Sequence, residues 1–252
     1  GQGRALCCGS VCSVTEDQTG DGSVDMSQAS AAVLFDVNNK KVLYSKNAHE
    51  RLYPASLTKI MTCLIALENG NLSDVVTVSE SALADLDEDS SVAGLVVGEQ
   101  MTLENLLYCM MVVSGNDACN VIAEHVAGSV TDFVRMMNQR AYELGCTNTH
   151  FNNPHGLHDE SHYTTARDLA IITQAALKSE NFRQIVDTYE YKLPDDNMRQ
   201  NIPKLKTTNM LIYQSMSNSL YYPRAHGIKT GYTSQAGRCV ISEATGDGLD
   251  LL

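Results

Sequence analysis

The chain has 252 residues, of which 43% are hydrophobic and 19% are charged, as in an ordinary globular protein. Its net charge of −12 argues against a nucleic-acid partner, because a phosphate backbone requires a basic surface. The eight cysteines do not indicate a disulfide framework or a structural zinc, since no C-x-x-C pair occurs and four of them lie in apolar segments: Cys63, Cys109, Cys119 and Cys239.

Residues 1–28 are predicted to be a disordered leader or linker outside the fold. They open with an apolar run that contains Cys7, Cys8 and Cys12, and they continue into the polar, acidic residues 15–22. This is the composition of a secretory remnant followed by a linker, or of an added sequence followed by disorder. The segment is too short and too polar to span a membrane.

A β-hairpin and a helix follow. Residues 31–36 and 41–45 are rich in β-formers and are separated by a turn at residues 37–40. A helix is then predicted to start at Pro54 and to stop at Gly70, because apolar residues recur with helical spacing between them. The helix is apolar on most sides, which predicts that it lies inside a domain.

The start of this helix carries Ser56 and Lys59, which share one helix face. Burial disfavours a charged lysine, and a neutral Lys59 is able to accept the proton of Ser56. The free backbone N–H groups at a helix start are suited to hold an oxyanion. A Ser-x-x-Lys motif is weak alone, since roughly one is expected by chance in a chain of this length.

The remaining chain is predicted to be helical first and then strand-rich. Helices are expected at residues 102–113, at 116–127, from a cap at Thr131 to Gly145, and at 165–178. Residues 152–158 are too rich in turn formers to be regular. The strand pattern begins at about residue 189 and is clearest at residues 225–232, 237–244 and 249–252.

Two further motifs accompany Ser56 and Lys59 in the order that a known constellation requires: Ser114-Gly115-Asn116 and Lys229-Thr230-Gly231. The chain also contains Asn153-Pro154-His155-Gly156-Leu157 and Thr165-Ala166-Arg167-Asp168. With these motifs, the sequence from about residue 28 to its end resembles the serine-type D-alanyl-D-alanine carboxypeptidases, which are low-molecular-mass penicillin-binding proteins.

The resemblance implies an α/β fold, an antiparallel sheet flanked by helices with an inserted helical subdomain. Residues 29–252 would form the catalytic domain, with a sheet-containing part at 29–70 and 189–252 and a helical subdomain at 71–188. Compared with many family members, the chain is expected to stop before the last strand is complete. It would lack the closing helix, the small β-rich second domain and the membrane-binding C-terminal segment. An extracytoplasmic location is implied.

The family's roles transfer to matching positions. Ser56 would be the nucleophile and Lys59 its general base, while Ser114 would relay a proton to the leaving amine. The backbone N–H groups of Ser56 and Tyr232 would form the oxyanion hole. The substrate-binding residues would be Asn116, Lys229, Thr230, Gly231, Tyr232 and Thr233.

These binding residues have distinct implied tasks. Asn116 would hold the substrate amide, and Lys229 would attract the substrate carboxylate and keep Lys59 neutral. Thr230 and Thr233 would donate hydrogen bonds to that carboxylate. Gly231 fits a strand edge that an extended peptide approaches closely.

The implied function is a serine D,D-carboxypeptidase that removes the terminal D-Ala from peptidoglycan stem pentapeptides through an acyl-enzyme on Ser56. β-Lactams would acylate the same serine, and no metal or organic cofactor is implied.

Three alternatives remain open. A class A β-lactamase would carry Ser-Asp-Asn and Glu-x-x-Leu-Asn, but Gly115 stands at the Asp position and the second motif is absent from the sequence. An inactive peptidoglycan-binding module is the second. The third is a metal site built from residues of one loop: His155, His158 and His162, with Asp159 or Glu160. Its spacing departs from H-E-x-x-H, and loop histidines are usually solvated.

Overall fold

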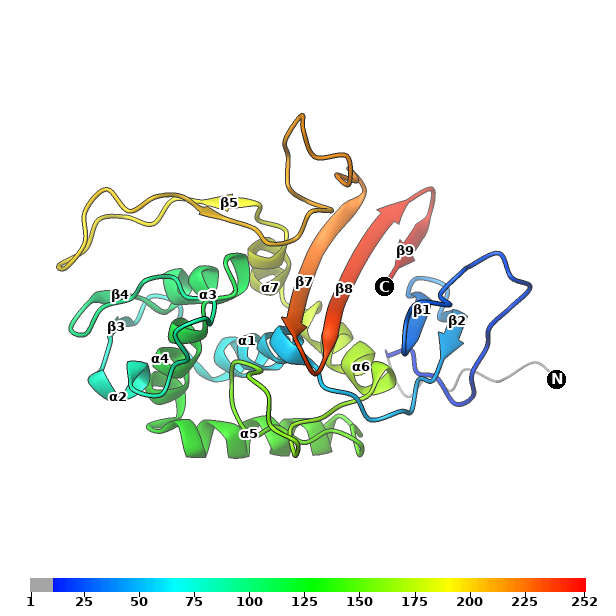
Figure 1. Ribbon diagram of the computed structural model, residues 1–252, viewed down its shortest axis with the longest axis horizontal. Coiled ribbons are helices and arrows are strands. Elements are labelled where there is room, and N and C mark those ends of the chain that lie inside the picture. Colours follow the sequence, from blue (N-terminus) through cyan, green and yellow to red (C-terminus); the bar gives the residue numbers. More distant parts are fainter. Residues whose placement is uncertain (1–10) are drawn as a thin grey trace.

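The computed structural model describes residues 11–252, and it places a twisted sheet beside a group of helices (Figure 1). The sheet has five antiparallel strands in the order β2-β1-β9-β8-β7. Their bounds are Ala32–Asp36 (β1), Lys41–Lys46 (β2), Ala225–Thr233 (β7), Gly237–Gly246 (β8) and Leu249–Leu251 (β9). The predicted antiparallel sheet flanked by helices is therefore confirmed.

The hairpin β1–β2, near the start of the chain, belongs to the same sheet as the three strands at its end. It pairs Ala32 with Lys46 and buries Phe35 completely, so the predicted hairpin is confirmed. β9 pairs with β8 on one side and with β1 on the other, so the last strand connects the two ends of the sequence. β7 is left as a terminal strand of the sheet.

Seven helices occur in the described residues, and most begin at a side-chain cap. Thr102, Ser129, Thr165 and Ser179 each accept a hydrogen bond from the backbone N–H three residues on. The bounds are Thr58–Asn69 (α1), Glu80–Leu83 (α2), Leu103–Val112 (α3), Asn116–Ala127 (α4), Val130–Glu143 (α5), Ala166–Ala176 (α6) and Glu180–Val186 (α7).

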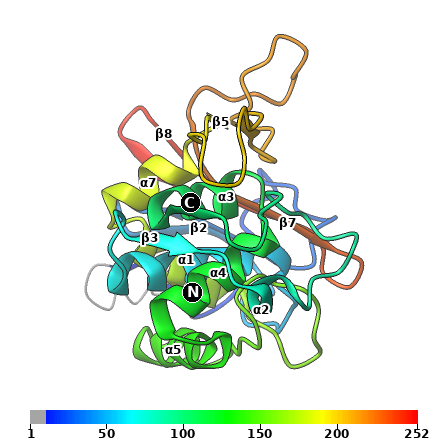
Figure 2. The ribbon, with the colours of Figure 1, turned by 90° about the vertical axis from the view of Figure 1, so that its left-hand side faces the viewer.

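Helix α1 runs through the centre of the molecule in both views (Figure 1 and Figure 2). It packs against α3, α4, α5, α6 and α7. All residues from Thr58 to Ala66 are buried, which confirms the prediction of an interior helix.

Two predictions about local structure are wrong. The cap of α5 is Ser129 and not Thr131, because the Ser129 hydroxyl accepts from the Asp132 N–H. The strand pattern expected from residue 189 onward yields only two short strands before β7, β5 (Glu190–Tyr191) and β6 (Leu205–Lys206). Pro194 and Pro203 lie between them, and proline lacks the N–H that a ladder needs.

The N-terminal segment also differs from expectation. Cys12 and Val14 are buried in the core, so the sequence prediction that all of residues 1–28 lie outside the fold is wrong at these positions. The reason is the amide of Gln174 in α6, which accepts from the Cys12 N–H at 2.8 Å and donates to the Cys12 carbonyl at 2.9 Å. Gln18 pairs with Ser45 of β2. Cys7 and Cys8 lie outside the described residues.

The six described cysteines carry free thiols, and all except Cys239 are buried. Two separate two-stranded antiparallel sheets accompany the main one: β3 (Val75–Thr77) pairs with β4 (Gln100–Thr102), and β5 pairs with β6. Between residues 11 and 252, no helix combines the length and hydropathy needed to cross a bilayer.

Candidate active site

Ser56 lies in a short 3-10 turn, Ala55–Leu57, that leads directly into α1. The side chain of Lys59 in the first turn of α1 points back to it, with 2.8 Å between Lys59 Nζ and Ser56 Oγ. Ala55 adopts the left-handed conformation, with φ of 50°. A non-glycine residue held in this region is strained, and such strain is concentrated at functional sites.

Lys59 is fully buried, although Ser56 remains partly exposed. Burial lowers the pKa of Lys59 to about 8, because the low-dielectric interior disfavours the ammonium. The Nζ also contacts the carbonyl oxygen of His155 at 2.9 Å. With this pKa, about a tenth of Lys59 is neutral at pH 7 and the neutral fraction rises with pH, as expected of a general base.

The loop at residues 152–162 holds the start of α1 in place. Thr62 Oγ1 donates to the Pro154 carbonyl at 2.6 Å. Gly156 has φ of 95°, and a Cβ there would lie 1.9 Å from the carbonyl oxygen of Ala55. Only glycine fits this close approach, so Gly156 fixes the position of the turn that carries Ser56.

His162 belongs to the same loop and is buried rather than solvated, contrary to the expectation for loop histidines. Its Nδ1 accepts from the Asn152 N–H at 2.9 Å, so Nε2 carries the proton and donates to Thr58 Oγ1 at 2.8 Å. Burial lowers the pKa of His162 to about 4. Both ring nitrogens are thus engaged in protein contacts, which contradicts a metal site built on this residue.

The second motif, residues 114–116, is joined to the third motif through Ser114 and Lys229. Ser114 is buried and has φ of 59°, between the end of α3 and the start of α4. Lys229 Nζ donates to Ser114 Oγ at 3.0 Å and to the Thr230 carbonyl at 2.8 Å. Burial, and then the charge of Lys59, lowers the pKa of Lys229 well below its usual range. Because repulsion between two ammonium groups acts on both, the charge of either lysine favours the neutral form of the other.

Asn116 is the first residue of α4, and its side chain is buried. Its Oδ1 has no hydrogen-bond partner among the described residues. A buried carbonyl oxygen without a partner is costly, so an incoming N–H group would be stabilised there.

The third motif lies on β7, which passes directly beside the Ser56 turn. A Cβ on Gly231 would lie 3.0 Å from the Ser56 nitrogen and 3.3 Å from Ala55 Cβ. Tyr232 is 67% exposed. Thr230 Oγ1 is hydrogen-bonded to Thr208 Oγ1 at 2.7 Å, and Thr233 Oγ1 accepts from the Ala236 N–H at 2.9 Å. β7 therefore brings the predicted binding residues to the edge of the sheet beside the nucleophile.

Two features of the site have no sequence signal that would have revealed them. The left-handed residues Ala55 and Ser114 are of types that rarely adopt this conformation. Asp117 anchors a remote loop by accepting from the N–H groups of Ala93 and Leu95, each at 2.9 Å. Local composition predicts a turn at these positions. It predicts neither the left-handed backbone nor the hydrogen bonds of Asp117.

Comparison with known proteins decides which family this geometry represents. The sequence model described as D-alanyl-D-alanine carboxypeptidase matches residues 17–252. The chain belongs to the D-alanyl-D-alanine carboxypeptidase family. The carboxypeptidase DacF of Bacillus subtilis is 42% identical over 225 residues, which cover 86% of this chain and 54% of the relative. The chain spans about half the length of the first curated relatives that it matches.

Solved structures of this family agree with the fold. The Streptomyces K15 DD-transpeptidase matches with a TM-score of 0.76 and 32% identity, over 87% of this chain and 86% of that one. Penicillin binding protein 5 from Haemophilus influenzae matches with a TM-score of 0.77 and 34% identity, over 94% of this chain and 65% of that one. The carboxypeptidase family fold is therefore shared along nearly the whole chain.

Proposed function

We propose that the chain is the catalytic domain of a serine D,D-carboxypeptidase, which removes the terminal D-Ala from peptidoglycan stem pentapeptides. The observation that carries this proposal is the double contact of two buried lysines with two serines, Lys59 with Ser56 at 2.8 Å and Lys229 with Ser114 at 3.0 Å. Membership in the D-alanyl-D-alanine carboxypeptidase family supports it.

In the proposed acylation, neutral Lys59 accepts the proton of Ser56 as Ser56 Oγ bonds to the carbonyl carbon of the penultimate D-Ala. The negative charge that develops on the carbonyl oxygen is held by the backbone N–H groups of Ser56 and Tyr232. The peptide C–N bond then breaks, and Ser114 relays the proton that Lys59 accepted to the leaving D-Ala amine, so that Lys59 and Ser114 return to their starting protonation states. Water later cleaves the ester and restores Ser56.

The substrate lies along β7 in this proposal. The terminal carboxylate faces Lys229, with Thr230 and Thr233 as hydrogen-bond donors, and Asn116 Oδ1 accepts from a substrate N–H. The open edge of β7 suits pairing with an extended peptide. We also propose that β-lactams acylate Ser56, that residues 71–188 act as the helical subdomain, and that the protein works outside the cytoplasm.

Mass spectrometry tests the nucleophile. Incubation with benzylpenicillin should add one penicilloyl group to the intact chain, and Ser56→Ala should abolish the adduct while the circular dichroism spectrum is retained. An adduct of the same yield on the Ser56→Ala protein would refute the assignment.

The fate of the adduct separates a carboxypeptidase from a β-lactamase. We expect the penicilloyl ester to persist for minutes, while D-alanine is released catalytically from diacetyl-Lys-D-Ala-D-Ala. Rapid turnover of penicillin without release of D-alanine would favour the lactamase. An inactive binding module would show neither the adduct nor D-alanine release.

A further inference from the structure

The segment between β5 and β6, residues 192–204, forms an arm that extends away from the sheet. In Figure 1 it passes above α3 and β4, and Figure 2 shows it above α3. Its base is fixed on α3, where the rings of Tyr191 and Tyr108 stack with centroids 3.8 Å apart. The Tyr191 hydroxyl also donates to Asn105 Oδ1 at 2.6 Å. The arm is thus held firmly at its base before it reaches the helical subdomain.

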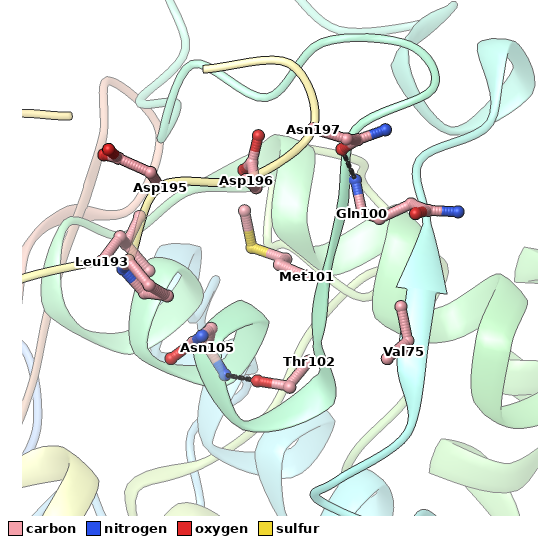
Figure 3. A pocket seen from close by; sticks show the side chains of 10 residues that line it. Val75, Gln100, Met101, Thr102, Asn105, Leu193, Asp195, Asp196 and Asn197 are labelled. Atoms are coloured by element: carbon pink, nitrogen blue, oxygen red, sulfur yellow. Dashed lines mark hydrogen bonds between the residues drawn. The ribbon is translucent and has the colours of Figure 1, made fainter. Parts of the chain in front are cut away.

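The tip of the arm is bonded to residues 91–99, which we call the entrance loop, and to the start of β4. Figure 3 shows Asn197 Oδ1 accepting from the Gln100 N–H, a contact of 2.8 Å at the rim of a cavity of about 290 Å³. Asn197 Nδ2 donates to the Gly98 carbonyl at 2.9 Å. Two hydrogen bonds therefore join one arm residue to both sides of the junction between the entrance loop and β4.

Arg199 forms a stronger connection. Its Nε donates to Glu99 Oε1 at 2.6 Å, and its Nη1 reaches the Ala93 carbonyl at 3.3 Å. Glu99 is completely buried, and its other oxygen accepts from the Val96 N–H at 3.0 Å. Removing one partner of such a pair leaves an uncompensated buried charge, so Arg199 strongly stabilises this conformation of the entrance loop.

The entrance loop in turn contacts the second motif. Ser91 accepts through its carbonyl from the Asn116 N–H at 2.8 Å. The carboxylate of Asp117 holds the N–H groups of Ala93 and Leu95. A Cβ on Gly115 would lie 3.2 Å from the Ala93 nitrogen, so loop and motif are in close contact. A displacement of Ala93 would therefore be transmitted to Gly115 and Asn116.

We propose that Arg199 is a positioning residue for substrate binding, acting through the entrance loop on Asn116. This rests on the proposed function, in which Asn116 binds the substrate amide. Ser56 and Lys59 are held by a different segment, residues 152–162, whereas the hydrogen bonds of the Arg199 side chain go to Glu99 and Ala93. Loss of Arg199 should consequently weaken binding and leave the acylation chemistry almost unchanged.

Acylation kinetics with benzylpenicillin test this separation. For Arg199→Ala we expect the half-saturating concentration to rise about tenfold, with the limiting acylation rate within about twofold of wild type. Arg199→Lys keeps a donor for Glu99 but cannot also reach Ala93 in the same geometry, so a smaller rise is expected. The matched control is Arg135→Ala on α5, where Arg135 is 75% exposed and bonded to Asp132; it should change neither constant.

Asn197→Ala is a second variant in case Arg199→Ala unfolds, because the bonds it removes are exposed. It should raise the half-saturating concentration by roughly threefold. A fall in the limiting rate as large as the rise in half-saturation, or unchanged kinetics in both variants, would overturn the proposal.

Amide hydrogen exchange separates failure of this inference from failure of the proposed function. If wild-type protein forms no penicilloyl adduct, the proposed carboxypeptidase function is refuted. The structural link between Arg199 and the second motif can still be measured. Exchange at residues 115–118 should then be faster in Arg199→Ala than in Arg135→Ala, and equal exchange would overturn the coupling.

Discussion

The start of α1 and the outer end of β7 meet at Ser56, but they differ in their exposure to solvent. Lys59 is fully buried and is bonded on two sides, whereas Tyr232 is 67% exposed on a terminal strand. Burial is what shifts the pKa of a lysine into the range of a base, and an open edge is what an extended ligand needs. In the proposed function the enclosed region supplies the base and the open strand edge admits the peptide, while two of the proposed binding residues, Asn116 and Lys229, are themselves buried.

The largest expected effect comes from removing the base. Lys59→Arg keeps the positive charge but cannot deprotonate at working pH, so acylation by penicillin should fall by about a thousandfold or more. Stopped-flow or quenched mass spectrometry measures the rate. Acylation of this variant near the wild-type rate would show that the enclosed region does not supply the base.

A methyl group at Gly156 should displace the turn that carries Ser56. In Gly156→Ala the new Cβ would clash with the Ala55 carbonyl, and we expect acylation to fall by about a hundredfold. The matched control is Gly128→Ala, since Gly128 also has a positive φ, of 84°, but nothing lies within 4 Å of its Cβ position. The control should lose about 1–2 kcal/mol of stability and retain its acylation rate.

The pH dependence of the acylation rate should follow the titration of Lys59. Because its pKa is lowered to about 8, Lys59 is protonated and inactive well below that pH and becomes neutral as the pH rises through it. The second-order acylation rate should rise roughly tenfold from pH 6 to 7 and level off above about pH 9. A profile that is flat between pH 6 and 9 would contradict a lysine base with this pKa.

Changes at the open edge should be smallest. Thr233→Val removes the hydroxyl that is proposed to bind the substrate carboxylate and that also accepts from Ala236, so KM for D-Ala-D-Ala peptides should rise by about threefold to tenfold. Thr233→Ser keeps the hydroxyl and should restore KM. Thr131→Val, at an exposed site on α5, serves as the control. Equal KM values for the Val and Ser variants would exclude a role for the hydroxyl.

Much of this architecture could be predicted because its signals are local. The hairpin at β1–β2, the interior helix α1 and the proximity of Ser56 and Lys59 follow from spacing alone. The three motifs and their order in the chain were enough to predict the D-alanyl-D-alanine carboxypeptidase family. These features depend on residues that are close in the sequence or on motifs with fixed spacing.

The rest depends on contacts between distant segments. Cys12 enters the core because Gln174 binds its backbone from 162 residues away. His162 is buried where its ring hydrogen-bonds to Thr58. Residues 192–204 are held as an arm by the bond between Arg199 and Glu99, which lies 100 residues earlier. No local pattern of polarity encodes these long-range pairings, so sequence reasoning placed the segments on the surface or in strands.

The two edges of the sheet differ in a way that bears on the colloidal behaviour of the protein. Gln18 pairs with Ser45 and so covers part of the β2 edge, while β7 ends the sheet on the other side. An uncovered strand edge is a template for pairing with another chain. The edge that is proposed to admit a ligand therefore carries the backbone groups with which any extended chain would pair, and a bound β-lactam would occupy the part of it beside Ser56.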